Sequence, residues 1–194
     1  MQPQLIVIGG PNGAGKTTCA MALLPDFLRV NNFVNADFIA SGISPFDPSL
    51  AEVQSAKVMV ERMYELKDNC ENFAIETTLA SKSIAAFIKN CKNIGYDTSL
   101  IYVALDSVET ALERVALRVR KGGHNIPEET VRRRYKRSVK NLFSIYMPIV
   151  NHWTIMDNTL QNNEPRLIAK LNGETDPKFF DLHYYFRLEE LSKC

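Results

Sequence analysis

Eight residues near the start of the chain have types and a spacing that suit phosphate binding. The stretch Gly10-Pro11-Asn12-Gly13-Ala14-Gly15-Lys16-Thr17 fits the pattern G-x-x-x-x-G-K-[ST] without a mismatch. Its glycines let the backbone curve around a phosphate. The backbone N–H groups from Gly13 to Thr18 would then point at that phosphate from the N-terminus of a helix, which attracts anions. Lys16 would reach the terminal phosphates and the Thr17 hydroxyl would hold Mg²⁺. The stretch predicts a nucleoside triphosphate site rather than a glycine turn that binds nothing.

Two carboxylates follow short apolar runs further along the chain. Asp37 comes after the run 33–36, and Glu76 comes after the run 73–75. Ligands of open parallel sheets bind beyond the carboxyl ends of the strands, so both side chains are expected beside the triphosphate. One of them could accept the proton of an attacking hydroxyl, and the other could hold Mg²⁺ directly or through water. The alternatives are structural, with Asp37 as a helix N-cap and Glu76 as the start of a turn.

A basic segment supplies a third component. Residues 111–140 contain ten lysines and arginines but only three glutamates, although the net charge of the whole chain is +1. Arginines outside the phosphate loop commonly stabilise the charge on a transferring phosphoryl group. We predict a helical lid over about residues 115–140, hinged at Gly122 and Gly123, with His124 in the lid loop rather than as a base. The candidate phosphate contacts are Arg118, Arg120, Arg132 and Arg134.

These arginines have an alternative role as a solvated basic face. Residues 132–134 are consecutive on a predicted helix and therefore point about 100° apart, so they cannot all face one phosphate.

Short apolar runs alternate with longer helical patterns, which is typical of an α/β fold with a parallel sheet. We expect strands over 5–8, 33–36, 73–75, 99–105 and 153–156. Helices are expected over 15–24, 48–69 and 81–95. A further helix should begin after a cap at Asp106, another should begin at Pro127, and a short one is expected over 166–171. The length suits one domain over 1–194, ending in an aromatic tail over about 174–194.

Composition narrows the class of protein further. Apolar residues make up 45% and charged residues 23% of the 194 residues, as in ordinary globular proteins. No apolar run approaches the length of a membrane span, the first residues lack the order of a signal peptide, and the four cysteines show no zinc spacing. We therefore expect a cytoplasmic protein with reduced thiols and no membrane partner.

In their order, these motifs resemble the zeta-toxin-like P-loop kinases over about residues 4–160. The resemblance rests on the phosphate loop and on Val34-Asn35-Ala36-Asp37, the run 44–48, Ile75-Glu76-Thr77-Thr78-Leu79, the run 122–127 and the run 132–135. It implies a three-layer α/β sandwich with a five-stranded parallel sheet in the order 2-3-1-4-5, and ATP and Mg²⁺ as cofactors.

The resemblance also implies roles for individual residues. Family members of toxin type phosphorylate the 3′-hydroxyl of the sugar in UDP-N-acetylglucosamine. Their catalytic base corresponds to Asp37, their strand-end glutamate to Glu76, and their lid arginines to members of the basic segment. A toxin of this kind would have a separate antitoxin protein as its partner.

Three functions therefore remain open, and we favour an ATP-dependent kinase that acts on a small-molecule hydroxyl. An NTPase that couples hydrolysis to motion is the second, because 100–106 reads as an apolar strand that ends in Asp106, although Ser107 stands where a glutamate would polarise water. A non-catalytic nucleotide-binding module is the third. Nucleic acid is not expected as a partner, since Tyr135 is the one aromatic residue among the arginines of 132–137.

Overall fold

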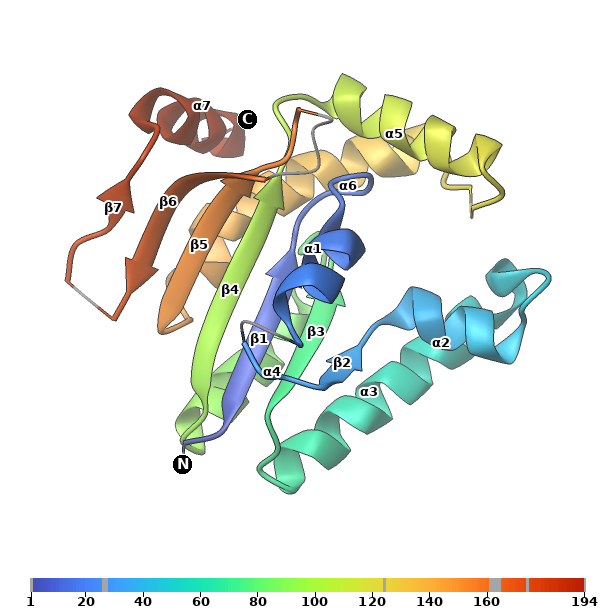
Figure 1. The fold of residues 1–194 in the computed structure, drawn as a ribbon, viewed down its shortest axis with the longest axis horizontal. Helices are drawn as coiled ribbons and strands as arrows, with labels where there is room; N and C mark the ends of the chain where they lie inside the picture. Colours follow the sequence, from blue (N-terminus) through green and yellow to red (C-terminus); the bar gives the residue numbers. More distant parts are fainter. Residues whose placement is uncertain (1, 26–27, 124, 161–164, 174, 194) are drawn as a thin grey trace.

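A seven-stranded sheet forms the centre of the molecule (Figure 1). The computed structural model describes residues 2–25, 28–123, 125–160, 165–173 and 175–193. Across the sheet the strands lie in the order β2-β3-β1-β4-β5-β6-β7. In chain order they are β1 (Gln4–Gly9), β2 (Asn32–Val34), β3 (Phe73–Thr77), β4 (Asp97–Ala104), β5 (His152–Asp157), β6 (Arg166–Asn172) and β7 (Lys178–Phe179).

The first five strands confirm the predicted parallel sheet and its order 2-3-1-4-5. Strand β1 lies between β3 and β4, with Ile8 opposite Glu76 in the β3 ladder. On the far side of β4, Ala104 lies opposite Asp157 of β5. Because all five strands run the same way, the phosphate loop after β1 and the ends of its neighbours share one edge of the sheet.

The last two strands were not expected, and the predicted helix over 166–171 is wrong. Those residues form β6, which pairs antiparallel with β5 and then with β7. A run of six residues is too short for its apolar spacing to distinguish a helix from a strand. Pairing decides the outcome, because β6 covers what would otherwise be an open edge along Trp153 and its neighbours.

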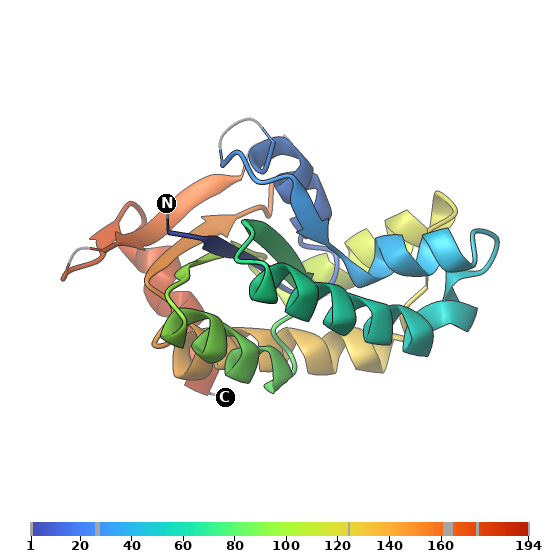
Figure 2. The ribbon, with the colours of Figure 1, turned by 90° about the horizontal axis from the view of Figure 1, so that it is seen from below.

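Helices cover both faces of the sheet (Figures 1 and 2). Residues of β1 alternate between two apolar clusters: Ile6 and Ile8 pack with the cluster that includes Ala20 of α1, and Leu5 and Val7 pack with the larger one. Among the helices of the described residues, all but α2 contribute buried side chains to the larger cluster, and Ala36 and Ile39 of α2 pack against it. The helices are α1 (Lys16–Leu23), α2 (Ala36–Ile43), α3 (Glu52–Asp68), α4 (Ser83–Asn93), α5 (Val108–Arg120), α6 (Glu128–Asn141) and α7 (Leu182–Lys193).

Two helix starts differ from the predicted ones. Ser107, rather than Asp106, is the N-cap of α5 and accepts a hydrogen bond from the backbone of Thr110. The predicted helix from residue 48 begins as a 3₁₀ turn over Pro48–Ala51, capped by the Asp47 side chain, and becomes regular at Glu52. Both differences lie within the first turn of the helix, where side-chain hydrogen bonds to backbone N–H groups determine which residue is the N-cap.

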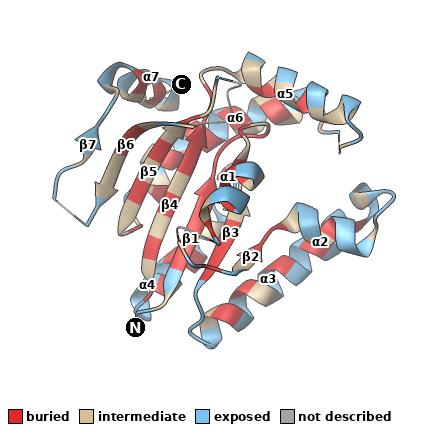
Figure 3. Cartoon of the chain, viewed as in Figure 1, coloured by how far each residue is buried: buried red, intermediate tan, exposed pale blue. Residues whose placement is uncertain are grey.

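The predicted lid segment packs into the body of the protein. Val115 of α5 and Val131, Tyr135 and Val139 of α6 are buried, and Figure 3 shows buried positions along the inner faces of both helices. Helix α6 continues as a π-helical turn over Leu142–Tyr146. In the part of the chain that the structure describes, no helix has the length and apolar character needed to cross a membrane.

Candidate functional site

The phosphate loop, residues 10–15, requires glycine where the sequence places it. Gly10 has a φ of 146°, and a Cβ atom there would lie 2.3 Å from the carbonyl oxygen of Val103. Gly13 and Gly15 have φ values of 78° and 83°, in the left-handed region. A Cβ on Gly15 would lie 2.6 Å from the side-chain nitrogen Nδ2 of Asn158. The loop is therefore packed closely against β4 and the segment after β5, at conformations that only glycine adopts without strain.

The loop fits an anionic ligand. Gly15 precedes α1 without a side-chain cap, and no acidic residue stands in the first turn of that helix. The N–H groups at the start of α1 are thus available to an anion. Asn12 is buried, and its side-chain oxygen has no hydrogen-bond partner among the described residues. A buried polar atom of this kind is expected to find its partner in a ligand or water.

Lys16 is held beside this loop as a buried cation. Its side chain is 8% exposed, its Nζ atom donates a hydrogen bond of 3.1 Å to the Pro11 carbonyl, and Nζ lies 3.7 Å from Oε1 of Glu76. Burial lowers the pKa of Lys16, while the negative charges of Glu76 and Asp37 oppose that shift and the positive charge of Arg118 adds to it. The ammonium therefore lies in a poorly solvated place where a phosphate would be a strong partner.

Thr17 and Glu76 bring two hard oxygen atoms together. The Thr17 hydroxyl donates a hydrogen bond of 2.8 Å to Oε2 of Glu76. Neighbouring ligands of an octahedral Mg²⁺ with bonds of about 2.0–2.1 Å are separated by about 2.9 Å, so this pair fits that ion. In the described ranges, no group of three or more His, Cys, Asp or Glu side chains is arranged so that it could hold a metal ion. Few protein ligands are typical of magnesium that is held together with substrate phosphates.

Asp37 lies in the first turn of α2, and the reading of Asp37 as the helix N-cap is wrong. The cap is Asn35, whose Oδ1 atom accepts hydrogen bonds from the backbones of Asp37 and Phe38. The Asp37 side chain is exposed, and its charge raises the pKa of Lys16. A carboxylate that is open to solvent and acts electrostatically on Lys16 is placed to meet a second substrate.

The arginines of α5 point in different directions. Arg118 is partly buried, and its positive charge contributes to the lowered pKa of Lys16. Arg120 is two residues further, which is about 200° around the helix, and it lines a surface depression with Glu113 and Leu117. Of these two candidates, Arg118 is the one whose charge acts on Lys16.

The arginines of α6 also separate. Arg132 pairs with Glu109 of α5 at 3.0 Å and with Glu128 at 2.8 Å, which joins the two helices at their surface. Arg134 is partly buried and follows Val131 by three residues, on the inward side of α6. His124 lies outside the described residues.

Three residues at the site were missed by the sequence reasoning. Asn35 donates a hydrogen bond of 2.7 Å from Nδ2 to Oε2 of Glu76. Asn158 follows β5 and donates from Nδ2 to the Ala14 carbonyl at 2.8 Å. Arg114 packs its Cβ beside Gly13 and donates to the Thr159 carbonyl at 3.0 Å. The rule that ligands gather beyond strand ends pointed to Asn35 and Asn158, but a neutral amide gave no reason to choose either.

Asp106, the carboxylate on which the NTPase hypothesis rests, bonds to residues outside the phosphate loop. Its Oδ1 atom accepts hydrogen bonds from the hydroxyls of Ser107 and Thr110 at the start of α5. The carboxylate that meets the Thr17 hydroxyl is Glu76 instead.

Two solved structures share the fold. A chain of the AvrRxo1-ORF1:-ORF2 complex with ATP has a TM-score of 0.77 and 17% identity over 98% of this chain. This chain spans only 64% of the length of that one. A chain of the PezAT chromosomal toxin-antitoxin system of Streptococcus pneumoniae has a TM-score of 0.64 and 18% identity, covering 98% of this chain and 78% of its own length.

Sequence comparison gives the family. An uncharacterized protein of Haemophilus influenzae is 32% identical over 135 residues, which cover 70% of this chain and 94% of that protein. The family model for Zeta toxin matches residues 48–164, more than half of the chain. The matched region contains Glu76, Arg118, Arg132 and Arg134, and the phosphate loop precedes it. With its P-loop kinase fold, this chain belongs to the Zeta toxin family.

Proposed function

We propose that this protein transfers the γ-phosphate of ATP to a hydroxyl group of a small molecule. The observation that carries the proposal is the cluster of Lys16, Thr17 and Glu76 under the phosphate loop, with the exposed Asp37 beside it. A protein that only bound a nucleotide would need the loop and the lysine, but it would not need a second, solvent-facing carboxylate next to them.

Each residue of the cluster has a part in this reaction. The phosphate loop and the start of α1 would hold the phosphates, and Lys16 would neutralise charge on the transferring group. Thr17 and Glu76 would hold Mg²⁺, which supplies charge neutralisation between the phosphates when bound. Asp37 would accept the proton of the acceptor hydroxyl. The hydroxyl oxygen would then bond to the γ-phosphorus while the bond from the γ-phosphorus to the leaving ADP oxygen breaks. Arg118 would stabilise the negative charge that develops.

The acceptor belongs to the proposal as well. Membership in the Zeta toxin family favours UDP-N-acetylglucosamine or another nucleotide sugar, with phosphate transferred to a sugar hydroxyl. Since ATP and such precursors are made in the cytoplasm, we expect the protein to act there.

A partner protein is also part of the proposal. The PezAT system is a toxin-antitoxin system, and the AvrRxo1 structure is a complex of AvrRxo1-ORF1 with ORF2. We expect an antitoxin chain that covers the nucleotide site of this protein and blocks the binding of ATP.

The decisive experiment follows labelled γ-phosphate from ATP with Mg²⁺ onto a panel of nucleotide sugars, sugars and nucleosides. Asp37→Asn should retain ATP binding and lose transfer by about 100-fold or more. Asp47→Asn is the matched control, because it removes one exposed carboxylate of the adjacent 3₁₀ turn and should transfer at the wild-type rate. Phosphate release that depends on neither acceptor nor Asp37 would contradict the proposal and favour an NTPase.

A further inference from the structure

The carboxylate of Asp157 at the end of β5 is buried and fully engaged. The residue is 7% exposed. Its Oδ1 atom accepts hydrogen bonds from the Thr159 backbone at 2.9 Å, from the Thr159 hydroxyl at 2.5 Å and from the Tyr184 hydroxyl at 3.0 Å. Its Oδ2 atom faces the guanidinium of Arg166 at 3.3 Å. With this set of donors, Asp157 serves as an internal acceptor that fixes the chain around it.

The segment 157–159, which Asp157 fixes, contacts the phosphate loop through Asn158 and reaches it indirectly through Arg114. Asn158 donates its backbone N–H to the Ala104 carbonyl and its side-chain amide to the Ala14 carbonyl at 2.8 Å. The Thr159 carbonyl accepts from Arg114 at 3.0 Å, and the Cβ atom of Arg114 packs beside Gly13. A shift of this segment would therefore move the backbone that is expected to bind phosphate.

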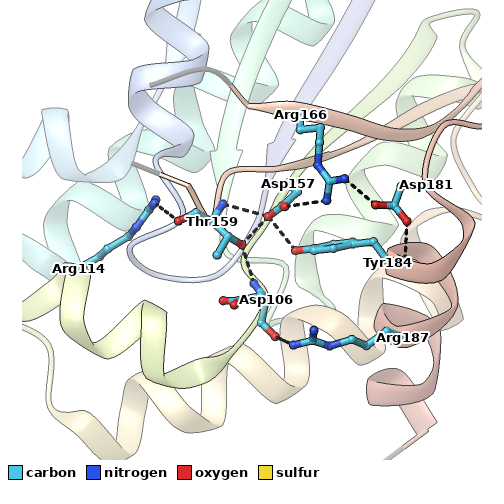
Figure 4. Close-up of polar contacts among 8 residues, drawn as sticks. All are labelled: Asp106, Arg114, Asp157, Thr159, Arg166, Asp181, Tyr184 and Arg187. Carbon is cyan, nitrogen blue, oxygen red and sulfur yellow. Dashed lines mark hydrogen bonds and ion pairs between the residues drawn. The ribbon is translucent and has the colours of Figure 1, made fainter. Parts of the chain in front are cut away.

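The opposite side of the segment is attached to the C-terminal elements (Figure 4). Tyr184 extends from α7 to Asp157, and Arg166 at the start of β6 bridges Asp157 and Asp181, reaching the latter at 2.6 Å. Arg187, also on α7, donates to the Asp106 carbonyl at 2.9 Å, while the Asp106 N–H donates to the Thr159 hydroxyl at 3.0 Å. Helix α7 thus reaches the segment by two routes, directly through Asp157 and indirectly through Asp106.

Tyr184 is placed to keep its proton in this contact. Burial and the charge of Asp157 raise the pKa of the Tyr184 hydroxyl, so it remains a donor to the carboxylate. The Thr159 hydroxyl uses its one proton toward Asp157 and its lone pair toward the Asp106 N–H. Both hydroxyls, those of Thr159 and Tyr184, therefore donate to the Asp157 carboxylate.

We propose that the C-terminal elements β6 and α7 set the nucleotide affinity of this protein, with Tyr184 as the positioning residue that holds the segment 157–159 against the phosphate loop. The inference rests on the proposed function, because it takes the loop to be an ATP site. Tyr184 touches no ligand in this proposal. It acts through Asp157, Asn158 and the Ala14 carbonyl.

The test is direct ATP binding, measured by calorimetry with Mg²⁺, on the full chain and its variants. Tyr184→Phe removes one hydroxyl and leaves Asp157 with Thr159 and Arg166, so the variant is expected to fold. Its Kd for ATP should rise about three- to tenfold, the effect of one hydrogen bond of ordinary strength. Arg187→Gln changes an exposed side chain on the indirect route and should raise the Kd in the same direction.

Tyr96→Phe is the matched control for lost stability. The Tyr96 hydroxyl is likewise buried and donates to backbone carbonyls, among them that of Leu66 at 3.1 Å. Tyr96 directly precedes β4, at the ends of the strands that lie away from the phosphate loop. Tyr96→Phe should lower the melting temperature as Tyr184→Phe does, and its Kd for ATP should equal the wild-type value.

Two further results separate this inference from the proposed function. Lys16→Met should abolish ATP binding if the loop is the nucleotide site. Wild-type affinity in Tyr184→Phe and Arg187→Gln, together with loss in Lys16→Met, would overturn the positioning role alone. No ATP binding by the wild-type protein would overturn the proposed function and this inference with it.

Discussion

The side-chain amide of Asn35 links the Glu76 carboxylate to the backbone of Asp37, since its Nδ2 atom lies 2.7 Å from Oε2 of Glu76 while its Oδ1 atom accepts the backbone N–H of Asp37. One side chain, 3% exposed, therefore sets the start of α2 and the orientation of Glu76 together. The backbone position of the proposed base and the orientation of the proposed metal ligand therefore depend on one neutral residue that takes part in neither role.

Replacement of Asn35 separates these two contacts. Asn35→Ala should lower the free energy of unfolding by about 1–2 kcal/mol, because it removes the helix cap, and it should also slow phosphoryl transfer. Asn35→Ser should restore most of that stability through its hydroxyl cap, but its side chain is too short to reach Glu76, so transfer should stay slow. Urea unfolding and the labelled-phosphate assay measure the two effects. Wild-type transfer by Asn35→Ser would limit the role of Asn35 to capping.

The Thr17 hydroxyl is expected to determine the magnesium requirement. Thr17→Val keeps the shape of the side chain but removes the oxygen next to Glu76, so the Mg²⁺ concentration for half-maximal transfer should rise about tenfold. Thr17→Ser retains the hydroxyl and should behave like the wild type. Titration of Mg²⁺ at fixed ATP tests this, and identical curves for the valine and serine variants would exclude Thr17 as a metal ligand.

Two glycines provide a matched pair for the packing of the phosphate loop. Gly10→Ala should destabilise the protein by about 3 kcal/mol or more, because its Cβ atom would clash with the Val103 carbonyl at a φ of 146°. Gly42→Ala in α2 has nothing within 4 Å of the new atom and should stabilise the protein by about 0.5–1 kcal/mol. Thermal unfolding of both variants checks the prediction. Equal melting temperatures would mean that the loop is not held against β4.

The two arginines of α5 should differ in their effect on transfer. Arg118→Met removes the positive charge that acts on Lys16 and should slow transfer by about 100-fold or more, with a smaller effect on ATP binding. Arg120→Met changes an exposed side chain about 200° around the helix and should stay within about threefold of the wild type. Single-turnover rates of the two variants are the measurement. A larger loss in Arg120→Met would assign the transition-state contact to that residue.

Local patterns in the sequence determined the parallel part of the fold and most of the charged residues at its edge. The phosphate-loop motif predicted glycine at Gly10, Gly13 and Gly15, where the backbone has positive φ values that other residues adopt only with strain. Asp37 and Glu76 were predicted from one rule, that parallel strands end at the same edge. That edge does bring Glu76 to Thr17 and Asp37 into the field of Lys16.

Tertiary structure decided what depends on contacts between distant segments. Residues 166–171 form a strand because they pair with the otherwise free edge of β5. The spacing of apolar residues within this segment does not indicate such a partner. Which arginine of α5 acts on Lys16 was set by the packing of that helix, in which Val115 is buried and Arg118 is partly buried. The roles of Asn35, Asn158 and Tyr184 arise from hydrogen bonds across 27 to 144 residues of sequence, and neutral side chains give no sign of such partners until the chain has folded.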